Sequence, residues 1–149
     1  MTNIAIVRVE LVKERTFKYE GSRQVRSAED AAAILRQYIG PADREMFIVL
    51  VLSVKQNVNA IHTVSVGILD ASVVHPREVF KPAILSNASA VIVGHNHPSG
   101  DPEPSPEDVS VTRRLVEAGK ILGIDVIDHI VIGDDGKFVS LRAKGWITD

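Results

Sequence analysis

Cysteine is absent from all 149 residues of the sequence. This absence excludes both a disulfide framework and a metal site built on thiolates, so any metal ion must be held by imidazole and carboxylate groups. Long apolar runs are absent too. No stretch reaches the roughly 18 residues of a membrane span, and Arg8 and Glu10 interrupt the apolar N-terminal stretch. We therefore expect no membrane segment, no signal peptide and a cytoplasmic protein.

An excess of either charge is also missing. The 17 basic and 19 acidic residues give a formal net charge of −2, so composition provides no general attraction to nucleic acid or to an anionic membrane. Apolar residues make up 45% and charged residues 24% of the chain, as is typical of a globular protein. The length suits one domain with a sizeable core.

Strand and helix patterns alternate along the chain, which predicts a single α/β domain with a mixed central sheet flanked by helices. Continuous apolar runs such as MFIVLVLS are typical of strands buried on both faces. We divide the chain into an N-terminal strand and loop extension, 1–26, and a domain, 27–149. Strands are expected at 4–12, 46–53, 58–69, 90–97, 125–132 and, after a hairpin turn at 133–136, at 138–141.

The helices are marked by the residues at their ends. Ser27 is a candidate N-cap, and Asp30 follows it in a capping-box position. Pro82 lies inside the second helix and should kink or divide it. The three helices should be bounded by Ser27 and Gly40, by Pro76 and about residue 88, and by Ser105 and Gly123.

The segment VGHNHPSGDPEPSPED, residues 93–108, follows an apolar run directly. On a strand, His95 and His97 would point to the same face, at the end of a buried strand where α/β sheets usually place ligand sites. Asp108 would lie in the first turn of the following helix. Two imidazoles and one carboxylate are a familiar ligand set for zinc, and three protein ligands leave a fourth position for water, as in catalytic sites.

A structural interpretation of the same residues stays open. The histidine pair could be ordinary polar residues, and Asp108 could only favour the start of a helix. We expect solvated side chains at Asp101, Glu103 and Glu107. The remaining histidines are interpreted as structural, and they are His62, His75 and His129.

The spacing of these residues matches H-x-H-x₇-S-x-x-D, the JAMM motif of MPN-domain metalloproteases. The surrounding text, with HPREVFKPAI and TRRLVEAGKILGIDVIDHIVIG, resembles the RadC family, known as DNA repair protein RadC, from about Ser27 to Trp146. The resemblance implies an MPN (cytidine-deaminase-like) architecture. Longer members of that family carry an N-terminal helix-hairpin-helix segment, whereas IAIVRVELVKERTFKYEG precedes the matched part here.

The resemblance also implies roles for individual residues. His95, His97 and Asp108 would hold one zinc ion, and Ser105 would lie beside the water or help to stabilise the oxyanion. Capping a helix is by itself an adequate reason for a serine at position 105. The motif's glutamate lies upstream, at the start of an early strand.

Glu45, which directly precedes MFIVLVLS, matches the place of that glutamate. It would take a proton from the metal-bound water and pass it to the leaving amine. Glu78 in HPREVF is the rival candidate. The sequence favours Glu45, because Glu78 lies on a helix whose exposed face would ordinarily carry such a residue.

Three functions are consistent with these features. The first is a zinc-dependent hydrolase that cleaves a peptide or isopeptide-like amide of a protein substrate. The second is a DNA-repair-associated protein that acts on or binds nucleic acid, and the third is a metal-stabilised interaction module without catalysis. The second hypothesis draws on local basic residues, namely Arg23, Arg26, Arg113, Arg114, Arg142 and Lys144.

The oligomeric state stays open, since strands at 4–12 and 138–141 could pair between subunits.

Overall fold

A computed structural model describes residues 1–67 and 74–148. The end of the strand expected at 58–69 and the final residue of the expected domain lie outside the described residues. The helices are α1 (Ala28–Ile39), α2 (Pro76–Leu85) and α3 (Pro106–Leu122). The strands are β1 (Met46–Leu52), β2 (Val58–Val66), β3 (Ala90–Asn96), β4 (Asp125–Ile132) and β5 (Phe138–Ser140).

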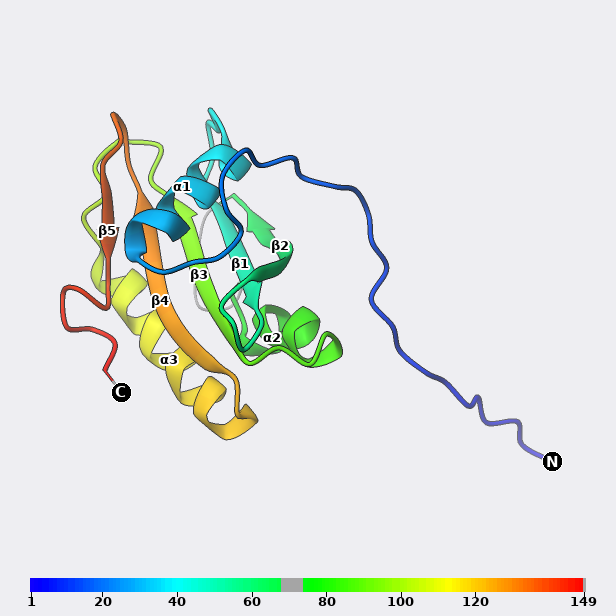
Figure 1. Cartoon of the computed structure of the whole chain (residues 1–149). Coiled ribbons are helices and arrows are strands. Elements are labelled where there is room, and N and C mark those ends of the chain that lie inside the picture. Colours follow the sequence, from blue (N-terminus) through cyan, green and yellow to red (C-terminus); the bar gives the residue numbers. More distant parts are fainter. Residues whose placement is uncertain (68–73, 149) are drawn as a thin grey trace.

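The strands form one five-stranded sheet in the order β2-β1-β3-β4-β5. Strands β3 and β4 pair in parallel, and the other neighbours pair antiparallel. Helix α1 covers one face of the sheet, and α2 and α3 cover the other (Figure 1). The sequence prediction of a mixed, helix-flanked α/β sheet is confirmed.

Burial follows the position of each strand in the sheet. Every residue of β3 is buried, and so are six of the seven residues of β1, because both strands lie between neighbours and beneath helices. Strand β2 forms one edge of the sheet, and its residues are half-buried or exposed. The apolar runs at 46–53 and 90–97 therefore mark the centre of the sheet, as continuous apolar patterns predict.

Local capping chemistry sets the start of α1 and α3. The Ser27 hydroxyl accepts a hydrogen bond from the Asp30 N–H at 3.3 Å, as expected of an N-cap. The Asp30 carboxylate accepts from the Arg26 N–H at 2.8 Å, one residue earlier than a capping box requires. At α3 the box is complete, because the backbone N–H groups of Ser105 and Asp108 each donate to the other residue's side chain.

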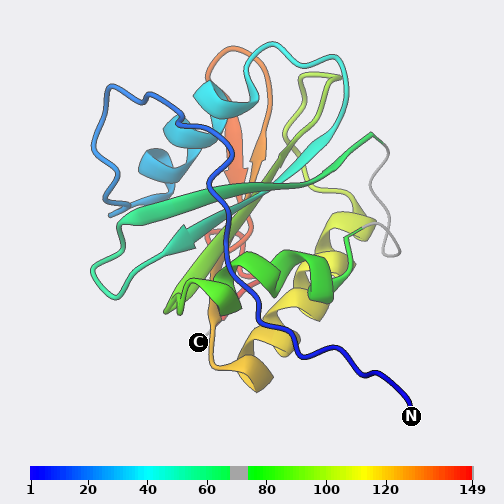
Figure 2. The same ribbon diagram turned by 90° about the vertical axis from the view of Figure 1, so that its right-hand side faces the viewer.

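Of the two effects predicted for Pro82, a division of the second helix does not occur, since α2 runs without interruption from Pro76 to Leu85. The strand predicted at 4–12 is wrong. Residues 4–12, all of them described, form no strand; Ile4 and Ile6 are 85% and 100% exposed on an extended arm that leaves the body of the protein (Figures 1 and 2). A strand needs a hydrogen-bonding neighbour, and along this arm the described part of the chain provides none.

The connection from β3 through α3 to β4 positions the site. Because β3 and β4 are parallel neighbours, the helix between them must begin near the C-terminal end of β3. Residues 97–105 make this link, and the His97 N–H donates to the Ile132 carbonyl at 2.9 Å. Among the described residues no helix has the length and apolar character to cross a membrane.

Gly94 lets α1 approach β3 one residue before His95. A Cβ atom on Gly94 would overlap the Leu35 side chain, which is fully buried. The tight contact between α1 and the site-bearing strand therefore depends on a glycine.

Gly94→Ala should lower the free energy of unfolding by about 1–3 kcal/mol, since overpacking forces neighbouring side chains out of their rotamers. Chemical denaturation measures this cost. In a Leu35→Ala background the cost of Gly94→Ala should shrink, because the obstructing atoms are gone. Equal costs in both backgrounds would contradict the steric explanation.

Candidate metal centre

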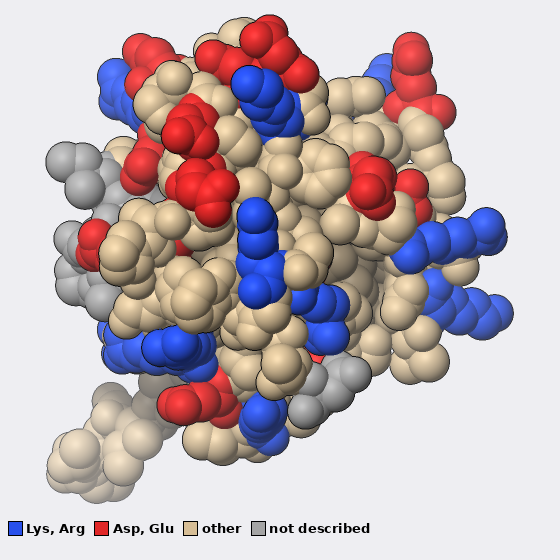
Figure 3. Space-filling model, turned by 90° about the vertical axis from the view of Figure 1, so that its left-hand side faces the viewer, with Lys and Arg blue, Asp and Glu red and all other residues tan. Residues whose placement is uncertain are grey.

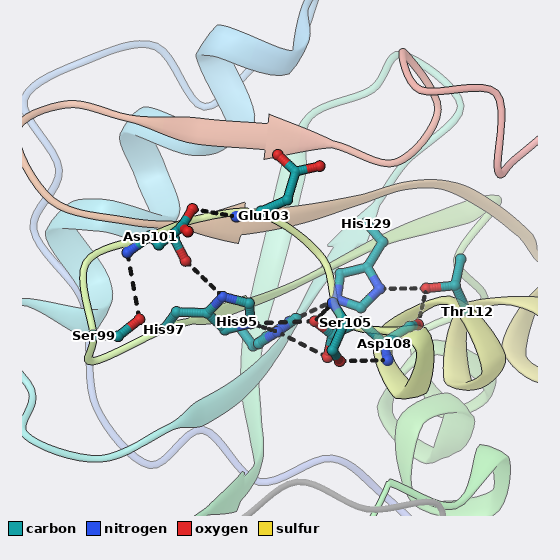
Figure 4. A network of polar contacts seen from close by, with 9 residues as sticks. All are labelled: His95, His97, Ser99, Asp101, Glu103, Ser105, Asp108, Thr112 and His129. Atoms are coloured by element: carbon teal, nitrogen blue, oxygen red, sulfur yellow. Dashed lines mark hydrogen bonds and ion pairs between the residues drawn. The ribbon is translucent and has the colours of Figure 1, made fainter.

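Three side chains from the end of β3 and the start of α3 converge (Figure 4). His95 lies in β3, His97 follows the strand, and Asp108 lies in the first turn of α3. The His95 and His97 Nε2 atoms are 3.1 Å apart. The Asp108 Oδ1 lies 3.3 Å from His95 Nε2, and its Oδ2 lies 3.1 Å from His97 Nε2. The predicted ligand set is thus brought to one point.

These distances fit a metal ion. Ligand atoms about 2.0–2.1 Å from a tetrahedrally coordinated ion lie about 3.3–3.4 Å from one another. The two Nε2 atoms are separated by a similar distance, and so is each Nε2 atom from one of the two Asp108 carboxylate oxygens. Among the described residues, His95, His97 and Asp108 form the group of histidine and acidic side chains able to hold a metal. The side chains of Asp101, Glu103 and Glu107 are exposed, as expected.

The second nitrogen of His97 is fixed by the loop that follows it. His97 Nδ1 lies 2.8 Å from the Asp101 carbonyl oxygen. A carbonyl can only accept, so Nδ1 carries the hydrogen and donates. In the neutral ring, Nε2 then keeps its lone pair for a metal.

Hydrogen bonds and one glycine fix the conformation of the loop between His97 and Asp108. Gly100 has φ = +93°, a backbone conformation that favours glycine. Its carbonyl accepts from the Asp134 N–H at 2.8 Å, which ties the loop to the turn between β4 and β5. Within the loop, the Glu103 N–H donates to the Asp101 carboxylate at 3.1 Å. These bonds orient the carbonyl that holds His97.

Asp108 serves the helix and the site with the same carboxylate. Its Oδ2 accepts from the Ser105 N–H at 2.9 Å and faces His97. Burial by itself would raise the pKa of Asp108, but its contacts with the His95 and His97 imidazoles hold it well below its ordinary value. Asp108 is therefore ionised in neutral solution, as a ligand must be.

A hollow of about 300 Å³ opens beside the ligands. The pKa of His97 is raised, chiefly by its hydrogen bond to Asp108, and the negative charge of Glu45 adds to the effect. Glu45 is thus close enough for its charge to act on the His97 imidazole. It directly precedes β1, as expected from the sequence. The hollow is lined by Glu45, His97, Pro98, Ser99, Ser105, Glu107 and Asp108.

Glu78 is not among the lining residues. Its carboxylate pairs with Lys81 at 2.9 Å and with Arg77 at 3.7 Å on the surface of α2. These neighbours, the Lys81 hydrogen bond first, lower the pKa of Glu78. Of the two glutamates that the sequence offers as a base, the structure brings Glu45 to the ligands.

The other histidines differ in their surroundings. His62 is exposed on β2, and His75 caps α2 by accepting from the Arg77 N–H at 3.0 Å. His129 is fully buried, and its Nε2 lies 2.7 Å from His95 Nδ1. Burial lowers the pKa of His129 well below its ordinary value.

Sequence reasoning treated His129 as structural and did not single out its other partner, Thr112. That threonine lies one helical turn after Asp108, and its Oγ1 is 2.5 Å from His129 Nδ1. Two features of the sequence could have suggested this pair. His129 lies inside a strand expected to be buried, and Thr112 lies four residues after the expected ligand Asp108.

Comparison with known proteins agrees with this geometry. A profile of the RadC-like JAB domain matches residues 25–146. The chain belongs to the RadC-like JAB domain family. It is 53% identical over 123 residues to a UPF0758 protein of Desulforamulus reducens, covering 83% of this chain and 54% of that protein. The resemblance recognised in the sequence is confirmed.

Further relatives support the same placement. The chain is 51% identical over 139 residues to a UPF0758 protein of Caldanaerobacter subterraneus, covering 93% of this chain and 59% of that one. It is 49% identical over 132 residues to a UPF0758 protein of Methanosarcina acetivorans, with coverages of 89% and 57%. The chain thus spans somewhat over half the length of these curated relatives.

The purified protein should carry about one divalent metal ion per chain, and His95→Ala and His97→Ala should each abolish it because two ligands hold a metal poorly. Elemental analysis measures the content. His62→Ala, at an exposed histidine outside the site, is the matched control and should keep the metal. Equal content in all four proteins would refute the ligand assignment.

Proposed function

We propose that this chain is a zinc-dependent hydrolase that cleaves a peptide or isopeptide-like amide. One observation carries the proposal: the three ligand atoms converge beside a hollow that Glu45 also lines. Two imidazoles and a carboxylate resemble the ligand sets of catalytic zinc sites. Zinc held there would polarise the substrate carbonyl and lower the pKa of a coordinated water.

Glu45 is the proposed general base. Its carboxylate would accept the proton of the attacking water and then give it to the nitrogen that leaves, so the proton balance closes on one residue. Its place at the start of β1 supports this role, since the Glu45 carbonyl accepts from the Gly67 N–H at 2.7 Å and holds the backbone. The same carboxylate acts on His97.

Ser105 is the proposed donor to the oxyanion. Its Oγ accepts from the Asp108 N–H at 3.1 Å, which leaves the O–H of Ser105 able to donate into the hollow. A hydroxyl aimed at the substrate carbonyl would stabilise the charge that develops during attack. The capping bond keeps the hydroxyl in place.

The charges around the hollow favour an amide over a phosphodiester. Glu45, Glu107 and Asp108 line it, and the lining includes neither lysine nor arginine. A phosphate would meet acidic groups, whereas a neutral amide and its departing amine would not be repelled. Phosphodiester cleavage often uses two metals, and the described residues supply one ligand group.

The six basic residues named from the sequence are not all on one surface. Arg23 lies beside β2 and Arg142 lies after β5, at opposite edges of the sheet. The face toward β5 carries acidic side chains, mostly in the upper part of the view, as well as lysine and arginine side chains, so it is not uniformly basic (Figure 3). This arrangement gives little support to binding along a nucleic-acid backbone.

Glu45→Gln should keep the metal but lower the rate of hydrolysis about 10²–10⁴-fold, because an amide cannot accept the proton. Steady-state turnover on a substrate found by screening, with metal content measured in parallel, tests this. Glu78→Gln removes a surface carboxylate and is the matched control, expected to retain activity. Full activity of Glu45→Gln would exclude Glu45 as the base.

A screen of peptide and isopeptide libraries beside single- and double-stranded DNA should show turnover of amides, because the site has one metal ligand set and an acidic lining. His97→Ala should abolish that turnover. Metal-dependent DNA cleavage that His97→Ala removes, without amide turnover, would reverse the ranking. Bound metal with no turnover of either class would favour the interaction module.

A further inference from the structure

We infer that Thr112 is a positioning residue for the metal site: acting through His129, its hydroxyl determines which nitrogen of His95 carries the hydrogen. The inference rests on the proposed metal site but not on hydrolysis. It concerns a chain of three hydrogen bonds that runs from the helix backbone to a ligand (Figure 4).

The direction of this chain follows from its first acceptor. The Thr112 Oγ1 lies 2.8 Å from the Asp108 carbonyl oxygen, which can only accept, so the hydroxyl hydrogen points there. The Thr112 oxygen must then accept from His129, and His129 Nδ1 carries the hydrogen of that 2.5 Å bond.

The same reasoning passes through the second ring. A neutral His129 with its hydrogen on Nδ1 has a lone pair on Nε2. That nitrogen lies 2.7 Å from His95 Nδ1, so His95 Nδ1 must be the donor. His95 Nε2 is then left without a hydrogen, with its lone pair directed toward Asp108 and His97.

Burial excludes solvent as an alternative hydrogen-bond partner for these side chains. His95, Thr112 and His129 are each 0% exposed, so water cannot replace a partner that is missing. The Phe47 ring packs against both histidines, with centroids 6.1 Å from His95 and 5.5 Å from His129. Both nitrogens of His129 and Nδ1 of His95 therefore take the partners that the protein supplies.

Loss of the Thr112 hydroxyl would reverse the direction of the hydrogen bond between His129 and His95. Without an acceptor at position 112, His129 would avoid a buried, unpaired Nδ1–H by carrying its hydrogen on Nε2 instead. His129 would then donate to His95 Nδ1, and the hydrogen of His95 would lie on Nε2, where a metal must bind. Metal affinity would fall although each ligand is unchanged.

Thr112→Val, which has nearly the same shape, tests this. Its dissociation constant for zinc, measured by competition with a chelator, should rise about 10–100-fold, as for other residues that orient ligands. Thr112→Ser keeps the hydroxyl and should restore binding. Thr63→Val is the matched control, because it removes a hydroxyl that contacts Tyr38 at 2.9 Å, away from the site. Zinc binding by Thr112→Val equal to that of the unsubstituted protein would overturn the inference.

A second readout needs neither zinc nor a substrate. In the metal-free protein the ionised Asp108 also attracts a hydrogen to His95 Nε2, so long-range ¹H–¹⁵N spectra should show a larger share of the Nδ1–H form of His95 in the unsubstituted protein than in Thr112→Val. Equal shares in the two proteins would refute the inference. A hydrogen on Nε2 of His129 in the unsubstituted protein would refute it even if Thr112→Val fails to fold, because His129 Nδ1 faces Thr112 directly. A failure to find hydrolysis would leave both measurements intact, so the two proposals can fail separately.

Discussion

Both ring nitrogens of His95 are fully buried, so both need polar partners within the protein. Nδ1 finds His129, and the lone pair of Nε2 is directed at the point where Asp108 and His97 would share a metal with it. These partners come from the loop after β3, from the first turn of α3 and from β4. Satisfying one buried imidazole therefore requires that the loop, the helix and the parallel neighbour strand all occupy their observed places.

The start of α3 meets several requirements with few atoms. Its N-cap and its third residue exchange two hydrogen bonds, and the same carboxylate faces both histidine ligands. A capping box is normally a device of local stability. Here it fixes the rotamer of Asp108 before any metal arrives, so the entropy of ordering that ligand is lost on folding and not on binding.

The sequence predicted those features that depend on neighbouring residues along the chain. The bounds of α1 and α3 follow from Ser27, Ser105 and the glycines beyond their ends, and the spacing of two histidines and an aspartate pointed to the group of side chains that could hold a metal. The rest depends on tertiary contacts. Residues 4–12 have the composition of a strand but no neighbour to pair with, and Pro82 is accommodated within α2. The place of His129 beside His95 depends on the register of β3 on β4, which no local pattern reports.

The site thus has a closed half and an open half. The closed half, His95, His129 and Thr112, is inaccessible to solvent and can influence a reaction only through the geometry and hydrogen placement of a ligand. The open half, with Glu45, His97 and Ser105, borders the hollow where a substrate would enter. A substitution in the closed half should therefore change the affinity for a metal, whereas one at Glu45 or Ser105 in the open half can change chemistry while a metal stays bound.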